Sequence, residues 1–113
     1  MDARIPANIE ASALIRRTQA EGGFATVLKK GHETAGTLLI VLTENGTNTR
    51  AYERMPQIDG TRAWSLTRTE NTENKREFED YLDRRKRQDD DLWIIELDIA
   101  GGERLIGLPG TRD

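Results

Sequence analysis

The residues with the clearest chemical potential are arginines and aromatic side chains that share one face of each of two expected neighbouring strands. These residues are Arg50, Tyr52, Arg54, Arg62, Trp64 and Arg68. Guanidinium groups bind phosphates and carboxylates through paired hydrogen bonds, and aromatic rings stack on bases. If the hairpin register brings both faces to the same side, the six side chains form a platform for a small anion or a nucleotide. A slip of one residue sends them to opposite faces.

A structural interpretation of the same residues stands beside this platform. Trp64 and Leu66 would pack into the core, while the arginines lie at its rim or pair with Glu53 and Glu70. The loop over residues 56–61 is too long for the sequence to determine how the two strands pair. Both interpretations therefore stay open.

The other charged groups are typical of the surface of a folded domain. The bases at residues 84–87 lie at the end of an expected helix, where they complement exposed carbonyl groups, and the acids at 89–91 follow directly. Those acids lack the spacing of a calcium loop. Glu96 and Asp98 could share a proton only if buried, and His32 lies in a polar loop near no nucleophile motif. We predict no catalytic residue, no metal site and no cofactor.

Length and composition indicate one soluble domain over residues 1–113. Hydrophobic residues make up 35% and charged residues 33%, and the net charge of -3 gives no field that would recruit a nucleic acid. The absence of cysteine excludes disulfide frameworks, thiolate zinc sites and cysteine nucleophiles. The longest apolar run, residues 38–42, is far shorter than the roughly 20 residues that span a bilayer, and no apolar leader opens the chain. We expect a cytoplasmic protein without a membrane partner.

Periodicity indicates the elements that must position these side chains. Apolar and charged residues alternate between residues 91 and 99, which predicts a half-buried strand. Residues 74–88 carry acids early and bases late, which predicts a helix. A shorter helix is expected over residues 12–21, capped by Ser12 and ended by the glycines at 22–23.

Four further strands are expected before the second helix, in meander order. Alternation predicts a strand over residues 24–30, and residues 37–42 are apolar on both faces, as in a central strand. The Asn-Gly dipeptide at 45–46 predicts a tight turn into a strand over residues 49–55. Residues 62–68 return as the fourth strand.

These elements predict an α+β fold in two layers, with a mostly antiparallel sheet of about five strands and two helices packed on one face. Two short helices cannot hide both faces of the strand at residues 37–42. Either the tail, through Leu105, Ile106 and Leu108, or another subunit must supply the missing cover.

That shortage of cover leads to a functional hypothesis. We expect a non-enzymatic protein-interaction module, a homodimer or larger homo-oligomer that takes an unidentified protein partner through its exposed sheet surface or an edge strand. The alternative is a small-anion or nucleotide-binding protein, which could be an enzyme, that uses the arginine and aromatic platform.

Five blocks of the sequence also carry a family resemblance. They are residues 13–17, 21–28, 35–39, 52–54 and 90–98. In this order they resemble the small bacterial proteins of domain-of-unknown-function family 1491, over about residues 8–99. The resemblance implies a compact, cytoplasmic, single-domain bacterial protein. It implies no activity and no site residue.

Overall fold

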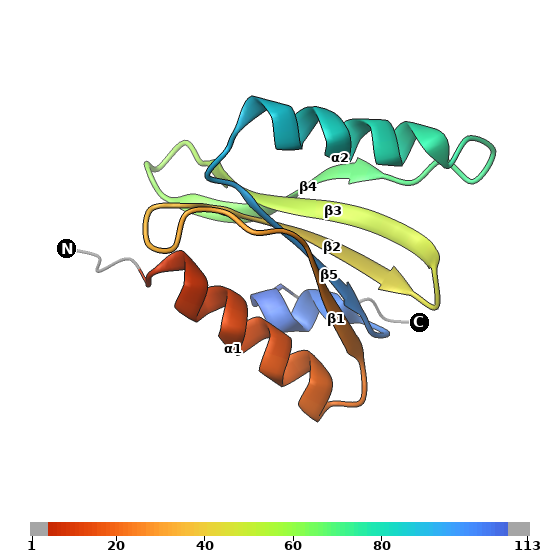
Figure 1. Cartoon of the computed structure of the whole chain (residues 1–113), viewed down its shortest axis with the longest axis horizontal. Helices are drawn as coiled ribbons and strands as arrows, with labels where there is room; N and C mark the ends of the chain where they lie inside the picture. Colours follow the sequence, from red (N-terminus) through yellow and green to blue (C-terminus); the bar gives the residue numbers. More distant parts are fainter. Residues whose placement is uncertain (1–4, 109–113) are drawn as a thin grey trace.

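A five-stranded sheet with helices on both sides forms the fold (Figure 1). The computed structural model describes residues 5–108. The elements are α1 (Ala7–Ala20), β1 (Phe24–Lys29), β2 (Leu38–Glu44), β3 (Thr47–Pro56), β4 (Arg62–Thr69), α2 (Arg76–Gln88), β5 (Trp93–Asp98) and the 3-10 helix η1 (Gly102–Ile106). The strand order is β1-β5-β2-β3-β4, and only β2 and β5 run parallel. The predicted α+β fold with about five mostly antiparallel strands is confirmed.

The position of β5 differs from the predicted meander. Only β2, β3 and β4 follow one another as antiparallel neighbours, whereas β5 is inserted between β1 and β2. Both β2 and β5 bury side chains on their two faces, and such strands are stable at the centre of a sheet. The more exposed β1 is displaced to the edge.

One face of the sheet, the α1 face, is covered by α1 together with η1. Leu14 of α1 and Leu105 of η1 pack there with Ile40 and Ile95 of the central strands. The sequence left two candidates for covering this face, the tail and another subunit. In the structure the tail covers it. With this cover in place, β2 is buried on both faces by its own chain.

The opposite face, the α2 face, is covered by α2. Phe78 and Leu82 pack there with Leu39 and Ile94. The two helices thus lie on opposite sides of the sheet, and the chain forms three layers (Figure 1). The predicted two-layer arrangement with both helices on one face is wrong, because successive side chains of β2 point to opposite faces and all are apolar up to Leu42.

Helix α1 begins five residues before the predicted start at Ser12. Pro6 precedes its first turn, and its buried stripe consists of Ala7, Ala11, Leu14 and Thr18. This spacing is the helical one, but alanine is weakly apolar, so the first two positions of the stripe give little signal in the sequence. The β2–β3 hairpin is as predicted, with Asn45 and Gly46 at φ values of 55° and 77°.

Candidate functional site

The β3–β4 hairpin places five of the six predicted platform residues on the α1 face. Tyr52 lies opposite Leu66 and Arg54 lies opposite Trp64, while Arg50 and Arg62 share this face by alternation. The hairpin register therefore allows most of the predicted convergence.

Arg68 is the exception, because the register shifts between Ala51 and Tyr52. Thr67 is the extra residue of β4 at this bulge, so Arg68 pairs with Ala51 and turns to the α2 face. Its guanidinium carbon lies 4.6 Å from the ring centroid of Tyr81 on α2. The predicted shared face of Arg62, Trp64 and Arg68 is wrong, since alternation does not continue through a bulge.

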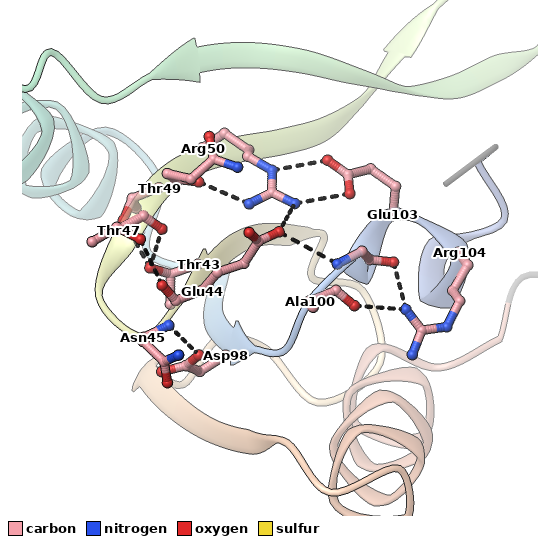
Figure 2. Close-up of polar contacts among 12 residues, drawn as sticks. Thr43, Glu44, Asn45, Thr47, Thr49, Arg50, Asp98, Ala100, Glu103 and Arg104 are labelled. Atoms are coloured by element: carbon pink, nitrogen blue, oxygen red, sulfur yellow. Dashed lines mark hydrogen bonds and ion pairs between the residues drawn. The ribbon is translucent and has the colours of Figure 1, made fainter. Parts of the chain in front are cut away.

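Arg50 forms a buried ion pair with Glu103 of η1 (Figure 2). Its Nε and Nη2 atoms donate to the two carboxylate oxygens of Glu103, each at 2.8 Å. Nη1 donates to the carbonyl oxygen of Asn48 at 2.8 Å, and Nη2 lies 3.4 Å from Glu44 Oε2. The Tyr52 hydroxyl donates to Glu103 Oε2 at 2.8 Å. Arg50 and Glu103 are each only 6% exposed, so this pair joins η1 to β3 inside the protein.

The electrostatics of this cluster favour the charged pair. The hydrogen bonds from Arg50 outweigh burial and lower the pKa of the Glu103 carboxyl to about 2. The same hydrogen bonds raise the pKa of Arg50. Burial, followed by the hydrogen bond to Glu103, raises the pKa of Tyr52. At neutral pH Arg50 is therefore a cation, Glu103 a carboxylate and Tyr52 a neutral phenol.

Two glycines bring Glu103 to this position. Gly101 adopts φ 63°, a left-handed conformation that glycine tolerates, and starts η1 directly after β5. A Cβ on Gly102 would lie 2.9 Å from Leu42 Cδ2, so a larger residue here would require the Leu42 side chain to shift. Nη1 of Arg104 donates to the carbonyl oxygens of Ala100 and Gly101 and closes the turn (Figure 2).

Arg54 binds a second carboxylate of the same chain. Its two terminal nitrogens donate to the two carboxylate oxygens of Glu10 on α1. Its guanidinium carbon also lies 4.4 Å from the ring centroid of Trp64. Arg62 donates to the carbonyl oxygen of Arg54 at 3.0 Å and makes no ion pair within residues 5–108. The two central arginines of the platform thus hold α1 and η1 against β3.

A matching polar cluster lies on the α2 face. Glu53 accepts hydrogen bonds from Arg85 Nη2 at 2.7 Å and from the Tyr81 hydroxyl at 3.2 Å. Thr67 Oγ1 lies 3.0 Å from the same hydroxyl. Glu53 therefore pairs with Arg85 of α2. The structural interpretation had proposed that Glu53 pairs with the platform arginines, and this is wrong. Each of the three covering elements is joined to β3 by an arginine–carboxylate pair.

The remaining candidate groups have structural surroundings. His32 Nδ1 accepts from the backbone N–H of Ala35 at 3.0 Å, and its carbonyl oxygen accepts from Trp93 Nε1 at 2.8 Å. Asp98 accepts from the backbone N–H of Asn45 at 2.8 Å. Burial, and then the negative charge of Asp98, raises the pKa of Glu96. Across residues 5–108, no three histidines or carboxylates are grouped to hold a metal ion, and no helix is long and apolar enough to cross a membrane.

The edge strand β1 carries three exposed apolar side chains. Phe24, Val27 and Leu28 are 73%, 43% and 37% exposed. A hollow of about 210 Å³ opens beside Phe24, and Glu21, Gly22 and Asp98 contribute to its lining. The sequence did not predict that β1 would be the exposed edge strand. It also did not predict which carboxylates accept hydrogen bonds from Arg50 and Arg54. Glu10 and Glu103 lie 44 and 53 residues from their arginines, and no local pattern links them.

Comparison with known proteins agrees with the fold. The family described as "Protein of unknown function (DUF1491)" matches residues 5–107. The chain belongs to the DUF1491 family. The crystal structure of a DUF1491 family protein from Caulobacter crescentus CB15 is 29% identical, with a TM-score of 0.78 over 94% of this chain and 98% of that one.

Two solution structures are similar to this DUF1491 chain as well. An NMR structure of a DUF1491 family protein from Caulobacter crescentus CB15 is 28% identical, with a TM-score of 0.78 over 98% of this chain and 100% of that one. Protein Atu0922 from A. tumefaciens is 29% identical, with a TM-score of 0.71 over 98% and 99% of the two chains. No curated protein matches the chain. The resemblance seen in the sequence is thereby confirmed, and the family description carries no activity.

Proposed function

We propose that this chain is a non-enzymatic protein-interaction module that self-associates through the edge of its sheet and acts in the cytoplasm. The single observation that carries the proposal is the apolar exposure of Phe24, Val27 and Leu28 on β1. An edge strand has unpaired backbone groups, and exposed apolar side chains on it favour pairing with another strand.

The opposite edge supports the choice of β1. Both edge strands carry a bulge, β1 between Val27 and Lys29 and β4 at Thr67, but β4 also carries the arginines Arg62 and Arg68, which discourage strand pairing. Strand β1 has one charged residue, Lys29, whose ammonium group is used inside its own chain. The two edges therefore differ in charge, and the less charged β1 is the edge that favours a partner strand.

Self-association predicts a mass that depends on concentration. In a light-scattering dilution series we expect the mass to fall from that of a dimer to that of a monomer. Val27→Lys should weaken association at least tenfold, because it places a charge on the pairing edge. Leu66→Lys, at a similarly exposed position of β4, is the matched control and should leave association unchanged. A strictly monomeric protein at every concentration would contradict the proposal.

A second candidate function is the binding of a small anion or nucleotide by the arginine and aromatic residues. It is favoured by Arg50 and Tyr52, which already bind the carboxylate of Glu103 with good geometry. Among the four platform arginines, Arg62 and Arg68 have no carboxylate partner within residues 5–108, and of these two only Arg62 lies on the α1 face. A bound phosphate or nucleotide would contact Arg62 and Trp64 first and compete with Glu10 for Arg54.

This candidate predicts a thermal shift. A ligand present at about 100 times its dissociation constant stabilises the fold by about 2.7 kcal/mol, so a screen of nucleotides and phosphorylated metabolites should raise Tm visibly. The double variant Arg54→Ala/Arg62→Ala should abolish the shift, while Arg84→Ala on the surface of α2 serves as the control. If no anion in the screen raises Tm, anion binding is excluded for those compounds.

A further inference from the structure

We propose that His32 is a pH-sensitive latch, which holds the first turn of α1 in place while its imidazole is neutral and releases it when the imidazole gains a proton. The latch lies in the β1–β2 loop, residues 30–37, which reaches the N-terminal end of α1 (Figure 1). His32 is the only histidine of the chain. This inference goes beyond the two proposed functions and depends on neither.

The imidazole closes a turn of the loop through one ring nitrogen. Nδ1 accepts from the backbone N–H of Thr34 at 3.2 Å and of Ala35 at 3.0 Å, and Thr34 Oγ1 lies 3.5 Å from it. Because both backbone groups are donors, Nδ1 must offer a lone pair, so the neutral ring carries its proton on Nε2. Protonation places an N–H on Nδ1 as well, facing these donors, and removes both hydrogen bonds.

Helix α1 depends on this turn for its N-terminal cap. Pro6 precedes the helix, and within residues 5–108 no side chain caps it. Instead the N–H of Asn8 donates to the carbonyl oxygen of Glu33 at 2.8 Å, and the N–H of Ala7 donates to that of Thr34 at 3.4 Å. The first four N–H groups of a helix have no partner inside it. Two of them are satisfied here by the turn that the imidazole closes.

Both ends of the loop are fixed, so opening is confined to the turn between them. The N–H of His32 donates to the carbonyl oxygen of Asp91 at 3.1 Å, and its own carbonyl oxygen accepts from Trp93 Nε1 at 2.8 Å. At the other end, a Cβ on Gly36 would lie 2.3 Å from the Asp91 carbonyl oxygen, so the backbone packs tightly there. Residues 33–35 carry the capping carbonyls, and protonation releases them without unfolding the sheet.

No neighbouring carboxylate compensates for the added proton. Among residues 5–108 the imidazole forms no ion pair. Ordinary carboxylates titrate below about pH 5 and lysine above about pH 9, so histidine is the side chain that changes charge between them. The charged residues on the elements that meet here are Lys30 and Glu33 of the loop, Glu10 of α1, and Asp89, Asp90 and Asp91 before β5.

The turn of α1 that the latch holds also carries Glu10. The Glu10 carboxylate accepts from both terminal nitrogens of Arg54, whose guanidinium lies over the Trp64 ring. A helix end that loses its cap frays, because its N–H groups lose their partners. Fraying withdraws Glu10 and leaves Arg54 and Trp64 open on the α1 face. The latch therefore regulates access to this part of the sheet.

Amide exchange measured by NMR at about pH 7.5 and 5.5 tests the latch across the range in which histidine titrates. After correction for the intrinsic exchange rate at each pH, the protection of the Ala35 and Asn8 amides should fall about tenfold at the lower pH, as expected for one lost hydrogen bond of ordinary strength. The fall should follow the imidazole signal of His32, which is unambiguous in a chain with one histidine. The amide of Leu39, in the buried strand β2, is the internal control and should keep its protection.

Three variants assign the effect to the imidazole. His32→Asn places an amide oxygen where Nδ1 accepts, and an amide does not titrate, so both amides should stay protected at both pH values. His32→Ala removes the acceptor and should leave them poorly protected at both. Glu33→Gln removes the neighbouring carboxylate and should retain the pH dependence of the natural protein.

The outcomes decide the proposal in every case. If His32→Asn keeps the pH dependence, another group causes it and the latch is wrong. If Ala35 loses protection and Asn8 does not, opening of the loop does not reach α1, and the proposal is overturned. Should a variant fail to fold, the natural protein decides alone, because amide changes with a different midpoint from the imidazole signal would contradict the latch. The oligomeric state is measured separately, so failure of self-association leaves this result unaffected.

Discussion

Glu103→Ala is expected to lower the free energy of unfolding by about 3–5 kcal/mol, because it removes the carboxylate that binds the buried Arg50 guanidinium at 2.8 Å and leaves only Glu44, at 3.4 Å. The Tyr52 hydroxyl loses its acceptor in the same variant. Urea denaturation measures the loss. Glu103→Gln retains the shape and one acceptor oxygen and should lose less. The double variant Arg50→Met/Glu103→Leu removes both charges together and should be more stable than Glu103→Ala.

The pH dependence of stability provides a further readout for the same pair. The pKa of Glu103 is about 2 in the folded protein, against 4.5 ordinarily. The charged carboxylate therefore stabilises the fold by about 3 kcal/mol above pH 4.5, and this stabilisation is lost as the pH falls towards 2. Glu96 acts in the opposite sense, because its raised pKa makes protonation favour the folded state. Glu103→Gln should flatten the acid side of the profile; an unchanged profile would contradict the assignment.

Ile95→Ala on β5 should cost about 2–5 kcal/mol, because Ile95 is fully buried on a strand that lies between β1 and β2. Val27 lies directly opposite it on β1 and is exposed on the same face. Val27→Ala is the matched control and should cost less than about 1 kcal/mol when measured on dilute, monomeric protein. Equal losses at the two positions would mean that β5 is not a covered inner strand.

Some features of this fold were predictable because they depend on neighbouring residues. The alternation of apolar and charged residues predicted β5. The Asn45-Gly46 pair predicted the β2–β3 turn, because both residues tolerate positive φ. The start of α1 was missed because Ala7 and Ala11 are small, so their buried stripe resembles an unremarkable surface. Local sequence patterns therefore predict that a helix or strand exists better than they predict the residues at which it begins and ends.

Features that depend on distant residues were not predictable. Alternation identifies the two faces of β5 but not its neighbours, so its insertion between β1 and β2 was missed. The bulge that turns Arg68 away leaves no mark in the sequence. The partners of Arg50 and Arg54 come from η1 and α1, and among many surface carboxylates the sequence does not distinguish Glu103 and Glu10.

The parallel pairing of β2 with β5 has a consequence for how the chain is made. During synthesis β1 and β2 leave the ribosome long before β5, which fills the slot between them. Until then the nascent chain has two open inner edges and an uncovered apolar strand, the condition in which growing chains aggregate or recruit chaperones. Folding must wait until β5 has been made, and the rate of translation therefore determines how long that vulnerable state lasts.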